Sequence, residues 1–281
     1  MSDHRKSMQR QLFATEKELY SESSVSALVY DMQTELFSKE CDGDVQFYLE
    51  AAGKFARVLD LGTGTGRVAW PMAEAGCSVV GLDVSKEMLK AAKEKRSKYS
   101  AATGKRVRFE HGDMANFNLP GTFDLIISPF RSFNHLIGPG EALRCLKKIR
   151  RHLRPDGKAV LHLRAYPIEH LDRLGEPPPD SAVPLTFLDG AVLTWRVCRR
   201  LIDKENNLFH LGMEFIYRSR EGIEERRSQE YWTVRWFDSY EFHDLVRQAG
   251  LDVAHEYSDF NCSPPKIAGE QIWVLRWPLR D

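Results

Sequence analysis

The sequence lacks the features that mark membrane-spanning, secreted and metal-binding proteins. No run approaches the roughly 18 apolar residues that a membrane span requires. The segment 1–6 is polar and has no apolar core of a signal peptide. The five cysteines, at positions 41, 77, 145, 198 and 262, show no paired spacing, so neither a zinc site nor a disulfide framework is indicated. We therefore expect a cytoplasmic protein with reduced thiols, no membrane partner and no metal.

The chain also lacks an excess of either charge. Lys+Arg and Asp+Glu both number 40, whereas proteins that bind nucleic acid usually carry a basic excess that engages phosphates. No nucleic-acid partner is therefore expected. The 281 residues suffice for one large domain with a sizeable insert, and 42% hydrophobic residues are ordinary for a globular protein.

What the sequence does contain is an apolar strand that runs into a glycine-rich loop. Val58 to Leu61 are followed by Gly62, Gly64 and Gly66. Glycines allow a sharp turn and let a ligand lie against the backbone. A helix predicted over 67–76 would direct its free N–H groups at that ligand, and its proline lies in the first turns, where it is least harmful. Strand, loop and helix together predict a nucleotide-binding corner.

The spacing of the glycines decides which nucleotide is favoured. Dinucleotide sites have glycine at the first, third and sixth positions of the loop, whereas here the fifth is Gly66 and the sixth is Arg67. Asp60 also precedes the first glycine. A carboxylate there would repel a pyrophosphate, but it would attract the ammonium and sulfonium groups of S-adenosylmethionine.

Acidic residues end the next two predicted strands. The strand Ser78–Asp83 ends in a carboxylate that can accept hydrogen bonds from ribose hydroxyls. The strand Val107–His111 leads into Asp113, which can accept from an adenine amino group. A helix cap or a solvated loop end is the alternative explanation of each acid.

The remaining pattern predicts an alternation of helices and strands. Further strands are expected over Phe123–Ser128, over Lys158–Leu163 after a turn at Leu153–Gly157, and as a hairpin over 251–260 and 271–277. Helices are expected over 44–52, after a cap at Ser85, over 141–153, and from a cap at Asp238 to Gly250.

Four of these features in this order resemble a class I S-adenosylmethionine-dependent methyltransferase of the small-molecule type. The matching segments are Asp60–Gly66, Asp83, Gly112–Met114 and Leu153–Gly157, and the resemblance covers about residues 45–165 and the C-terminal end. It implies an α/β fold with a doubly wound, mostly parallel seven-stranded sheet, and S-adenosylmethionine as the cofactor. The cofactor contacts that it implies are Tyr30, Asp60, Gly62, Thr63, Gly64, Gly66, Arg67, Asp83, Val84, Met88, Asp113, Met114, Ser128 and Phe130.

Methyl acceptors in such a fold meet the cofactor beyond the carboxyl ends of the strands. Ser128-Pro129-Phe130-Arg131 departs from the Asn/Asp-Pro-Pro-aromatic pattern of enzymes that methylate amino groups of DNA bases. His135 is the candidate catalytic base, with a structural histidine as the alternative. Candidate acceptor contacts are Arg131, Phe133, Arg164 and Tyr166, with ion pairing and core packing as their alternatives.

After residue 166, the spacing of apolar residues changes to every second position, which predicts an inserted subdomain. The proline-rich stretch 176–180 cannot be helix or central strand. Beyond it, apolar residues alternate with polar ones, which predicts about three antiparallel strands over 185–236 with a hairpin turn at 203–207. The predicted organisation is an N-terminal lid over 1–43, a core over 44–166 and 237–281, and an antiparallel insert over 167–236.

The pattern therefore predicts an enzyme that transfers a methyl group from S-adenosylmethionine to nitrogen or oxygen of a small molecule, with a possible homodimer through the inserted sheet. A protein or RNA methyltransferase and a non-catalytic cofactor-binding interaction protein are the alternatives. The residues leave the acceptor and the methylated atom open.

Overall fold

A computed structural model describes residues 17–18, 20–21, 24–36, 41–166, 183–187 and 189–278. The chain forms two compact units: a sheet unit of Met1–Val29 and Pro167–Arg235, and a core unit of Tyr30–Tyr166 and Trp236–Asp281. The first boundary falls inside helix α2 (Val25–Leu36), whereas the sequence pattern places the end of the N-terminal segment at residue 43. Positions 1–16 of that segment and the proline-rich stretch 176–180 lie outside the described residues.

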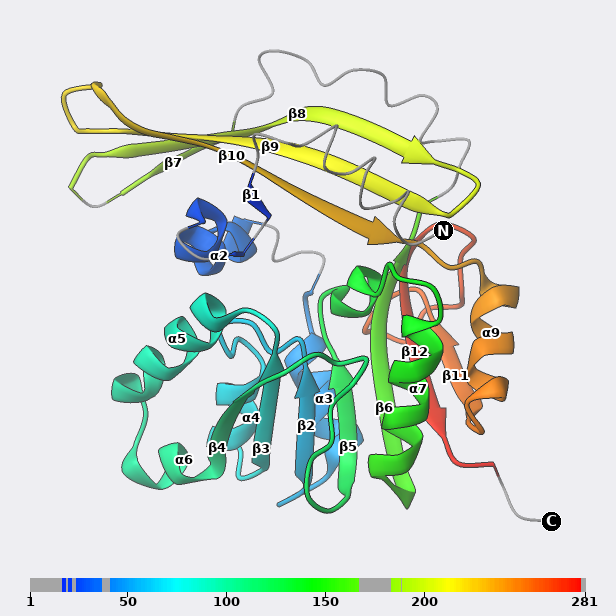
Figure 1. Cartoon of the computed structure of the whole chain (residues 1–281). Helices are drawn as coiled ribbons and strands as arrows, with labels where there is room; N and C mark the ends of the chain where they lie inside the picture. The colour runs from blue at the N-terminus through cyan, green and yellow to red at the C-terminus, as the bar shows by residue number, and fades with distance from the viewer. Residues whose placement is uncertain are drawn as a thin grey trace. The chain divides into compact units, whose positions relative to one another are not determined.

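The core unit is built on a seven-stranded, mostly parallel sheet, which confirms the predicted fold class. Its order is β11-β12-β6-β5-β2-β3-β4, and only β12 pairs in antiparallel fashion, with β6 and β11. Figure 1 shows the strands side by side. Their bounds are β2 Arg57–Leu61, β3 Ser78–Asp83, β4 Val107–His111, β5 Phe123–Ser128, β6 Leu153–Ala165, β11 Asp252–Tyr257 and β12 Gly269–Arg276.

Helices cover both faces of this sheet, as expected for a mostly parallel sheet whose central strands are apolar. One hydrophobic cluster joins one face to α7 and α9, and a second joins the opposite face to α3 and α4. In Figure 1, α7 lies in front of the strands and α3 behind them. The bounds are α3 Asp44–Ala52, α4 Ala69–Glu74, α5 Lys86–Glu94, η2 Lys95–Lys98, α6 Ala101–Arg106, η3 Ser132–His135, α7 Glu141–His152 and α9 Ser239–Gln248.

Most predicted elements of the core unit are confirmed, including two helix caps. The Ser85 hydroxyl accepts from the Met88 N–H, and the Asp238 carboxylate accepts from the Glu241 N–H. Two predictions differ from the structure. The helix expected from residue 67 begins only at Ala69, because the loop continues as turns. The turn expected at Leu153–Gly157 lies inside β6, where an irregularity in the pairing with β5 accommodates the extra residues.

The sheet unit contains the predicted antiparallel strands, with one more than expected. Strands β7 (Val183–Thr186), β8 (Val192–Asp203), β9 (Leu208–Arg218) and β10 (Glu224–Arg235) pair in succession, and the short β1 (Lys17–Glu18) adds in parallel to β10. Side chains that include Val25, Trp195 and Phe215 form its hydrophobic cluster. No helix within the described ranges is long and apolar enough to cross a membrane.

Candidate cofactor and acceptor site

The glycine loop after β2 requires glycine for both conformation and space. Gly62, Gly64 and Gly66 all have positive φ (71°, 55° and 73°), which L side chains rarely adopt. A Cβ on Gly62 would lie 2.5 Å from the Cβ of Ser132. At Gly64, in contrast, the nearest atoms are a Met88 methyl at 3.3 Å and the Tyr30 ring at 3.9 Å, so a larger side chain would enter the space between them.

Asp60 provides a buried acceptor beside this loop. Its side chain is 0% exposed, and Oδ2 accepts a hydrogen bond from the Thr63 hydroxyl at 2.7 Å, while Oδ1 has no partner among the described residues. Burial raises the pKa of Asp60 to about 7, although the Thr63 hydrogen bond and the Arg67 charge lower it. An unpaired buried acceptor is costly unless a ligand or water satisfies it. The residue therefore fits a cationic or hydrogen-bond-donating ligand.

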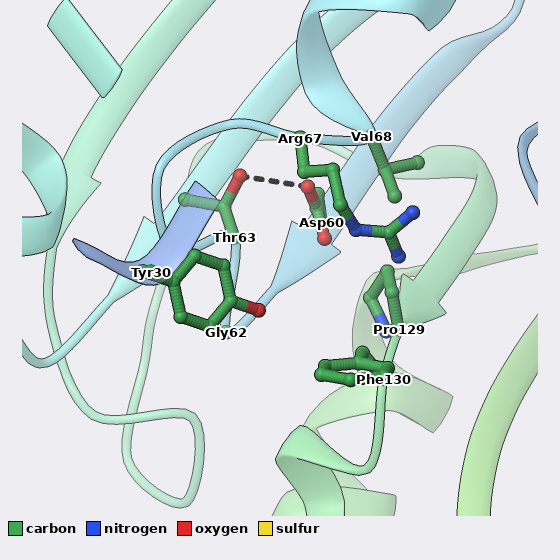
Figure 2. A pocket seen from close by; sticks show the side chains of 8 residues that line it. All are labelled: Tyr30, Asp60, Gly62, Thr63, Arg67, Val68, Pro129 and Phe130. Atoms are coloured by element: carbon green, nitrogen blue, oxygen red, sulfur yellow. Dashed lines mark hydrogen bonds between the residues drawn. The ribbon is translucent and has the colours of Figure 1, made fainter. Parts of the chain in front are cut away.

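A small pocket that is partly open to solvent lies against Asp60. Figure 2 shows the Tyr30 ring and the Phe130 ring near the Asp60 carboxylate, with the Arg67 guanidinium beside them. The Arg67 guanidinium is held by a bidentate ion pair with the buried Asp44, at 3.1 and 2.5 Å. The pocket thus presents a carboxylate, a fixed guanidinium and two aromatic rings. The remaining lining residues are Gly62, Thr63, Val68 and Pro129.

The two other predicted acids follow β3 and β4. The carboxylate of Asp83 accepts from the backbone N–H of Gly64 at 2.7 Å and of Ser85 at 2.8 Å, so it ties β3 to the glycine loop. Burial raises the pKa of Asp83, and these backbone hydrogen bonds partly offset that rise. Asp113 is exposed, and its carboxylate accepts from the Ala115 N–H at 2.7 Å, which closes its own turn.

Apolar side chains surround the same edge of the sheet. Met88 is buried beside Gly64, and a Met114 methyl lies 3.4 Å from the position of a Cβ on Gly62. Val84, directly after β3, is 68% exposed. An apolar side chain so exposed at the end of a strand is suited to cover a planar ligand such as a base.

The backbone after β5 is strained at two consecutive residues that are not glycine. Phe130 and Arg131 have φ of 47° and 67°, a conformation that costs about 1 kcal/mol or more per residue and is frequent at functional sites. This turn directs the Phe130 ring to the pocket and the Arg131 side chain toward β12. Ser128, at the end of β5, is fully buried, and its hydroxyl has no hydrogen-bond partner within the described part of the chain.

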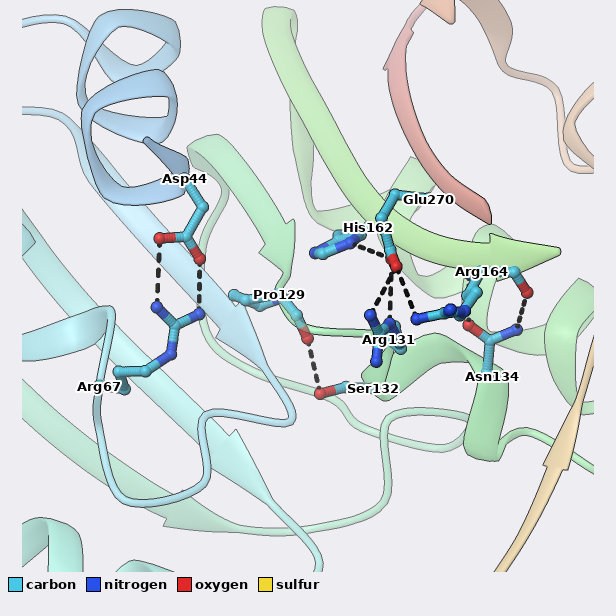
Figure 3. Close-up of polar contacts among 9 residues, drawn as sticks. All are labelled: Asp44, Arg67, Pro129, Arg131, Ser132, Asn134, His162, Arg164 and Glu270. Carbon is cyan, nitrogen blue, oxygen red and sulfur yellow. Dashed lines mark hydrogen bonds and ion pairs between the residues drawn. The ribbon is translucent and has the colours of Figure 1, made fainter. Parts of the chain in front are cut away.

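Arg131 and Arg164 meet at one carboxylate, Glu270 of β12. Arg131 donates to Glu270 through Nε at 2.9 Å and Nη2 at 2.5 Å, and Arg164 donates through Nη1 at 2.9 Å. The buried His162 lies 2.8 Å from the same carboxylate (Figure 3). Burial raises the pKa of Glu270, but the hydrogen bonds from His162 and Arg131 outweigh it and lower that pKa to about 2. Both arginines therefore form ion pairs, which was the alternative to acceptor binding for these residues.

The other predicted acceptor residues occupy different environments. His135 lies in η3 with a solvent-exposed side chain, and desolvation by the atoms packed around it lowers its pKa, so the ring is neutral at pH 7. Phe133 is fully buried in the core against Phe237 and Phe242, so packing is its role there. Tyr166 is partly buried and lies 5.7 Å from the Arg164 guanidinium.

Sequence reasoning missed the partners that fix these side chains. Asp44 and Glu270 each hold an arginine of the site, and neither belongs to a motif. Glu270 lies 139 positions from Arg131 in the sequence, so only the pairing of β12 with β6 brings the two together. In the sequence, the signal that could have found these partners is an acidic residue at the start of a predicted helix or strand near the sheet edge.

Comparison with known proteins agrees with this geometry. Residues 58–157 match the family model described as a methyltransferase domain. The putative methyltransferase YqeM of Bacillus subtilis is 25% identical over 218 residues, 77% of this chain and 82% of that protein. A dTDP-3-amino-3,6-dideoxy-alpha-D-glucopyranose N,N-dimethyltransferase of Streptomyces fradiae is 31% identical over 114 residues, 41% of this chain and only 42% of that protein.

A solved structure extends the likeness of the fold over nearly the whole chain. The sugar N-methyltransferase KedS8 of Streptoalloteichus sp superposes with a TM-score of 0.68 at 18% identity, covering 92% of this chain and 95% of that one. Residues 58–157 match a methyltransferase-domain family, and the chain has the fold of the class I S-adenosylmethionine-dependent methyltransferases.

Proposed function

We propose that this chain binds S-adenosylmethionine at the carboxyl edge of the core sheet and transfers its methyl group to a small-molecule nitrogen or oxygen. The observation that carries the proposal is Oδ1 of Asp60, a buried acceptor that has no partner among the described residues and lies in a pocket beside a glycine loop. A pyrophosphate would be repelled by this carboxylate. The ammonium group of S-adenosylmethionine would satisfy it.

The other residues at this edge would hold the remaining parts of the cofactor. Asp83, fixed against Gly64, would accept from the ribose hydroxyls. Asp113 and Met114 would flank the adenine, with Val84 covering its other side. Tyr30, Arg67, Met88 and Phe130 would enclose the amino-acid end together with Thr63, and Ser128 would close the end of β5.

Bound S-adenosylmethionine supplies a methyl group that its sulfonium already activates. The chain's own task is to orient the acceptor behind that methyl and to exclude water. Tyr30 and Phe130, which line the pocket, are suited to exclude water. His135, with a neutral ring at pH 7, is the proposed base that takes a proton from an ammonium or hydroxyl acceptor.

A small molecule with an amino group is the acceptor that the relatives favour. The Streptomyces fradiae enzyme and KedS8, two of the similar proteins, are named for N-methylation of sugars. The pattern at Ser128–Arg131 departs from the enzymes that methylate DNA bases, and the balanced charge disfavours nucleic acid. Arg131 after β5, Arg164 near the end of β6 and Tyr166 directly after β6 would contact the acceptor at this edge. A homodimer through the sheet unit and a lid formed by the N-terminal segment remain parts of this proposal.

Calorimetric titration with S-adenosylhomocysteine tests the cofactor site. We expect clear binding by the wild type, strong weakening in Gly64→Val and Asp83→Ala, and unchanged binding in Asp156→Ala. Asp156 is an exposed acid at the opposite end of β6 and serves as the matched control. Binding of NADH in place of S-adenosylhomocysteine would refute the proposal.

Turnover assays test the acceptor class. Formation of S-adenosylhomocysteine would be measured with a library of amino sugars and other small amines and alcohols, in parallel with tRNA and peptide pools. Turnover confined to the small molecules supports the proposal, whereas turnover confined to tRNA or peptides would reassign the acceptor.

A further inference from the structure

Three side chains outside the pocket connect helix α2 to the glycine loop. The Asp31 carboxylate accepts from the Thr65 hydroxyl at 2.5 Å and pairs with the Lys95 ammonium at 2.6 Å. The Lys95 ammonium also donates to the Thr65 hydroxyl oxygen at 2.9 Å. The three groups therefore form a closed triangle, which we call the Asp31 clasp. All of its members belong to the core unit.

The clasp lies directly beside the residues that contact the ligand space. Thr65 stands between Gly64 and Gly66 in the loop and is buried. Asp31 follows Tyr30, whose ring lies 3.9 Å from the position of a Cβ on Gly64 and lines the pocket. Asp31 and Lys95 do not themselves line that pocket. Their influence on a ligand would therefore pass through Tyr30 and the loop.

The anchor on the opposite side comes from the end of α5. Lys95 begins η2 immediately after α5, and α5 also supplies Met88, which contacts the Gly64 side of the loop. The side chains of Lys95 and Asp31 are 19% and 42% exposed, so solvent screens part of their ion pair and the Thr65 hydroxyl adds the buried contact. The clasp thus links three elements, α2, the loop and α5, at one point around the pocket.

We propose that Asp31, Thr65 and Lys95 are positioning residues that hold Tyr30 over the glycine loop and so slow the release of the bound cofactor product. The proposal rests on the proposed function, because it requires that the pocket binds S-adenosylmethionine and its product. Loosening the clasp frees Tyr30 to move from the loop without removing any group that lines the pocket.

The dissociation rate of radiolabelled S-adenosylhomocysteine, chased with unlabelled compound, tests the proposal. We expect Lys95→Met and Asp31→Asn to raise this rate about threefold to fivefold, which corresponds to about 0.6–1 kcal/mol for loss of a half-exposed ion pair. Lys98→Met is the matched control, since Lys98 is an exposed lysine in the same η2, and its rate should equal the wild type. Lys95→Arg should restore most of the wild-type rate.

A double mutant separates positioning from a merely structural role. If the clasp acts through Tyr30, then Tyr30→Ala combined with Lys95→Met should release the compound as fast as Tyr30→Ala alone. The thermal midpoints of the unliganded variants show that each is folded, and Asp31→Asn replaces Lys95→Met if the latter does not fold.

Three outcomes overturn the account, at different levels. A wild-type rate in both Lys95→Met and Asp31→Asn refutes the clasp. Multiplied rates in the double mutant refute its action through Tyr30. Failure of the wild type to bind S-adenosylhomocysteine at all refutes the proposed function itself, independently of the clasp.

Discussion

Cofactor affinity should depend on pH because of Asp60. Burial raises the pKa of this carboxyl to about 7 in the unliganded protein, so it is only partly ionised at neutral pH. An ammonium group that binds at its unpartnered oxygen requires the ionised form. Binding should therefore weaken as the pH falls, since a growing share of the protein then carries a protonated Asp60.

The size of the effect follows from the titration. With a pKa of about 7, the ionised fraction is about 0.76 near pH 7.5 and about 0.03 near pH 5.5. The dissociation constant of S-adenosylhomocysteine should thus rise about 25-fold over this range, which corresponds to about 1.9 kcal/mol of binding free energy. Near pH 6.5, about 0.8 proton should be released for each molecule bound.

Isothermal titration calorimetry measures both quantities, the second from the dependence of the heat on the ionisation enthalpy of the buffer. Asp60→Asn is the matched variant, because its amide oxygen can still accept from the Thr63 hydroxyl. It should bind more weakly near pH 7.5, release no proton and show a flat profile. An equally steep profile in Asp60→Asn would show that another group is responsible and would refute the reasoning.

Three further outcomes are expected from the same site. In the absence of ligand, the raised pKa of Asp60 stabilises the wild type at low pH, and this contribution is lost as the pH rises through 7. The free energy of unfolding of Asp60→Asn, relative to the wild type, should therefore increase by about 1.4 kcal/mol per pH unit between about pH 5 and 7. A constant difference between the thermal midpoints of the two proteins over this range would contradict this. Glu270→Gln should lower the free energy of unfolding, measured in urea near pH 7, by about 2–3 kcal/mol, because two guanidiniums lose their partner. The difference from the wild type should disappear as the pH falls through the lowered pKa of Glu270 at about 2. The exposed Glu221→Gln serves as its control and should match the wild type. His135→Ala should lower kcat at least about 100-fold without changing the affinity for S-adenosylhomocysteine. His255 is an exposed histidine, and His255→Ala should leave kcat unchanged as the control. Unchanged turnover in His135→Ala would show that His135 is not the base.

Local patterns carried the prediction of the core unit a long way. Strands β3, β4 and β5 have the predicted bounds, because β3 and β5 are short apolar runs and β4 alternates apolar with charged residues. The caps Ser85 and Asp238 were also predictable, since a helix start depends on the residue itself and on the two or three that follow. The turn at Leu153–Gly157 was predicted wrongly because the neighbouring β5 pairs on both sides of it, and that pairing is not a local property.

The sequence by itself determined the class of fold and the position of the glycine loop, because glycine spacing, strand period and helix caps are encoded within a few residues. Only the tertiary structure decided how the charged groups are shared. Asp44 holds Arg67, Glu270 gathers Arg131, Arg164 and His162, and Asp31 joins Lys95. These partners lie on separate helices and strands, so the order of the strands and the packing of α2 and α3 bring them together. The more deeply such an ion pair is buried, the more each charge depends on its partner, because a charge removed from water is stable only beside an opposite charge.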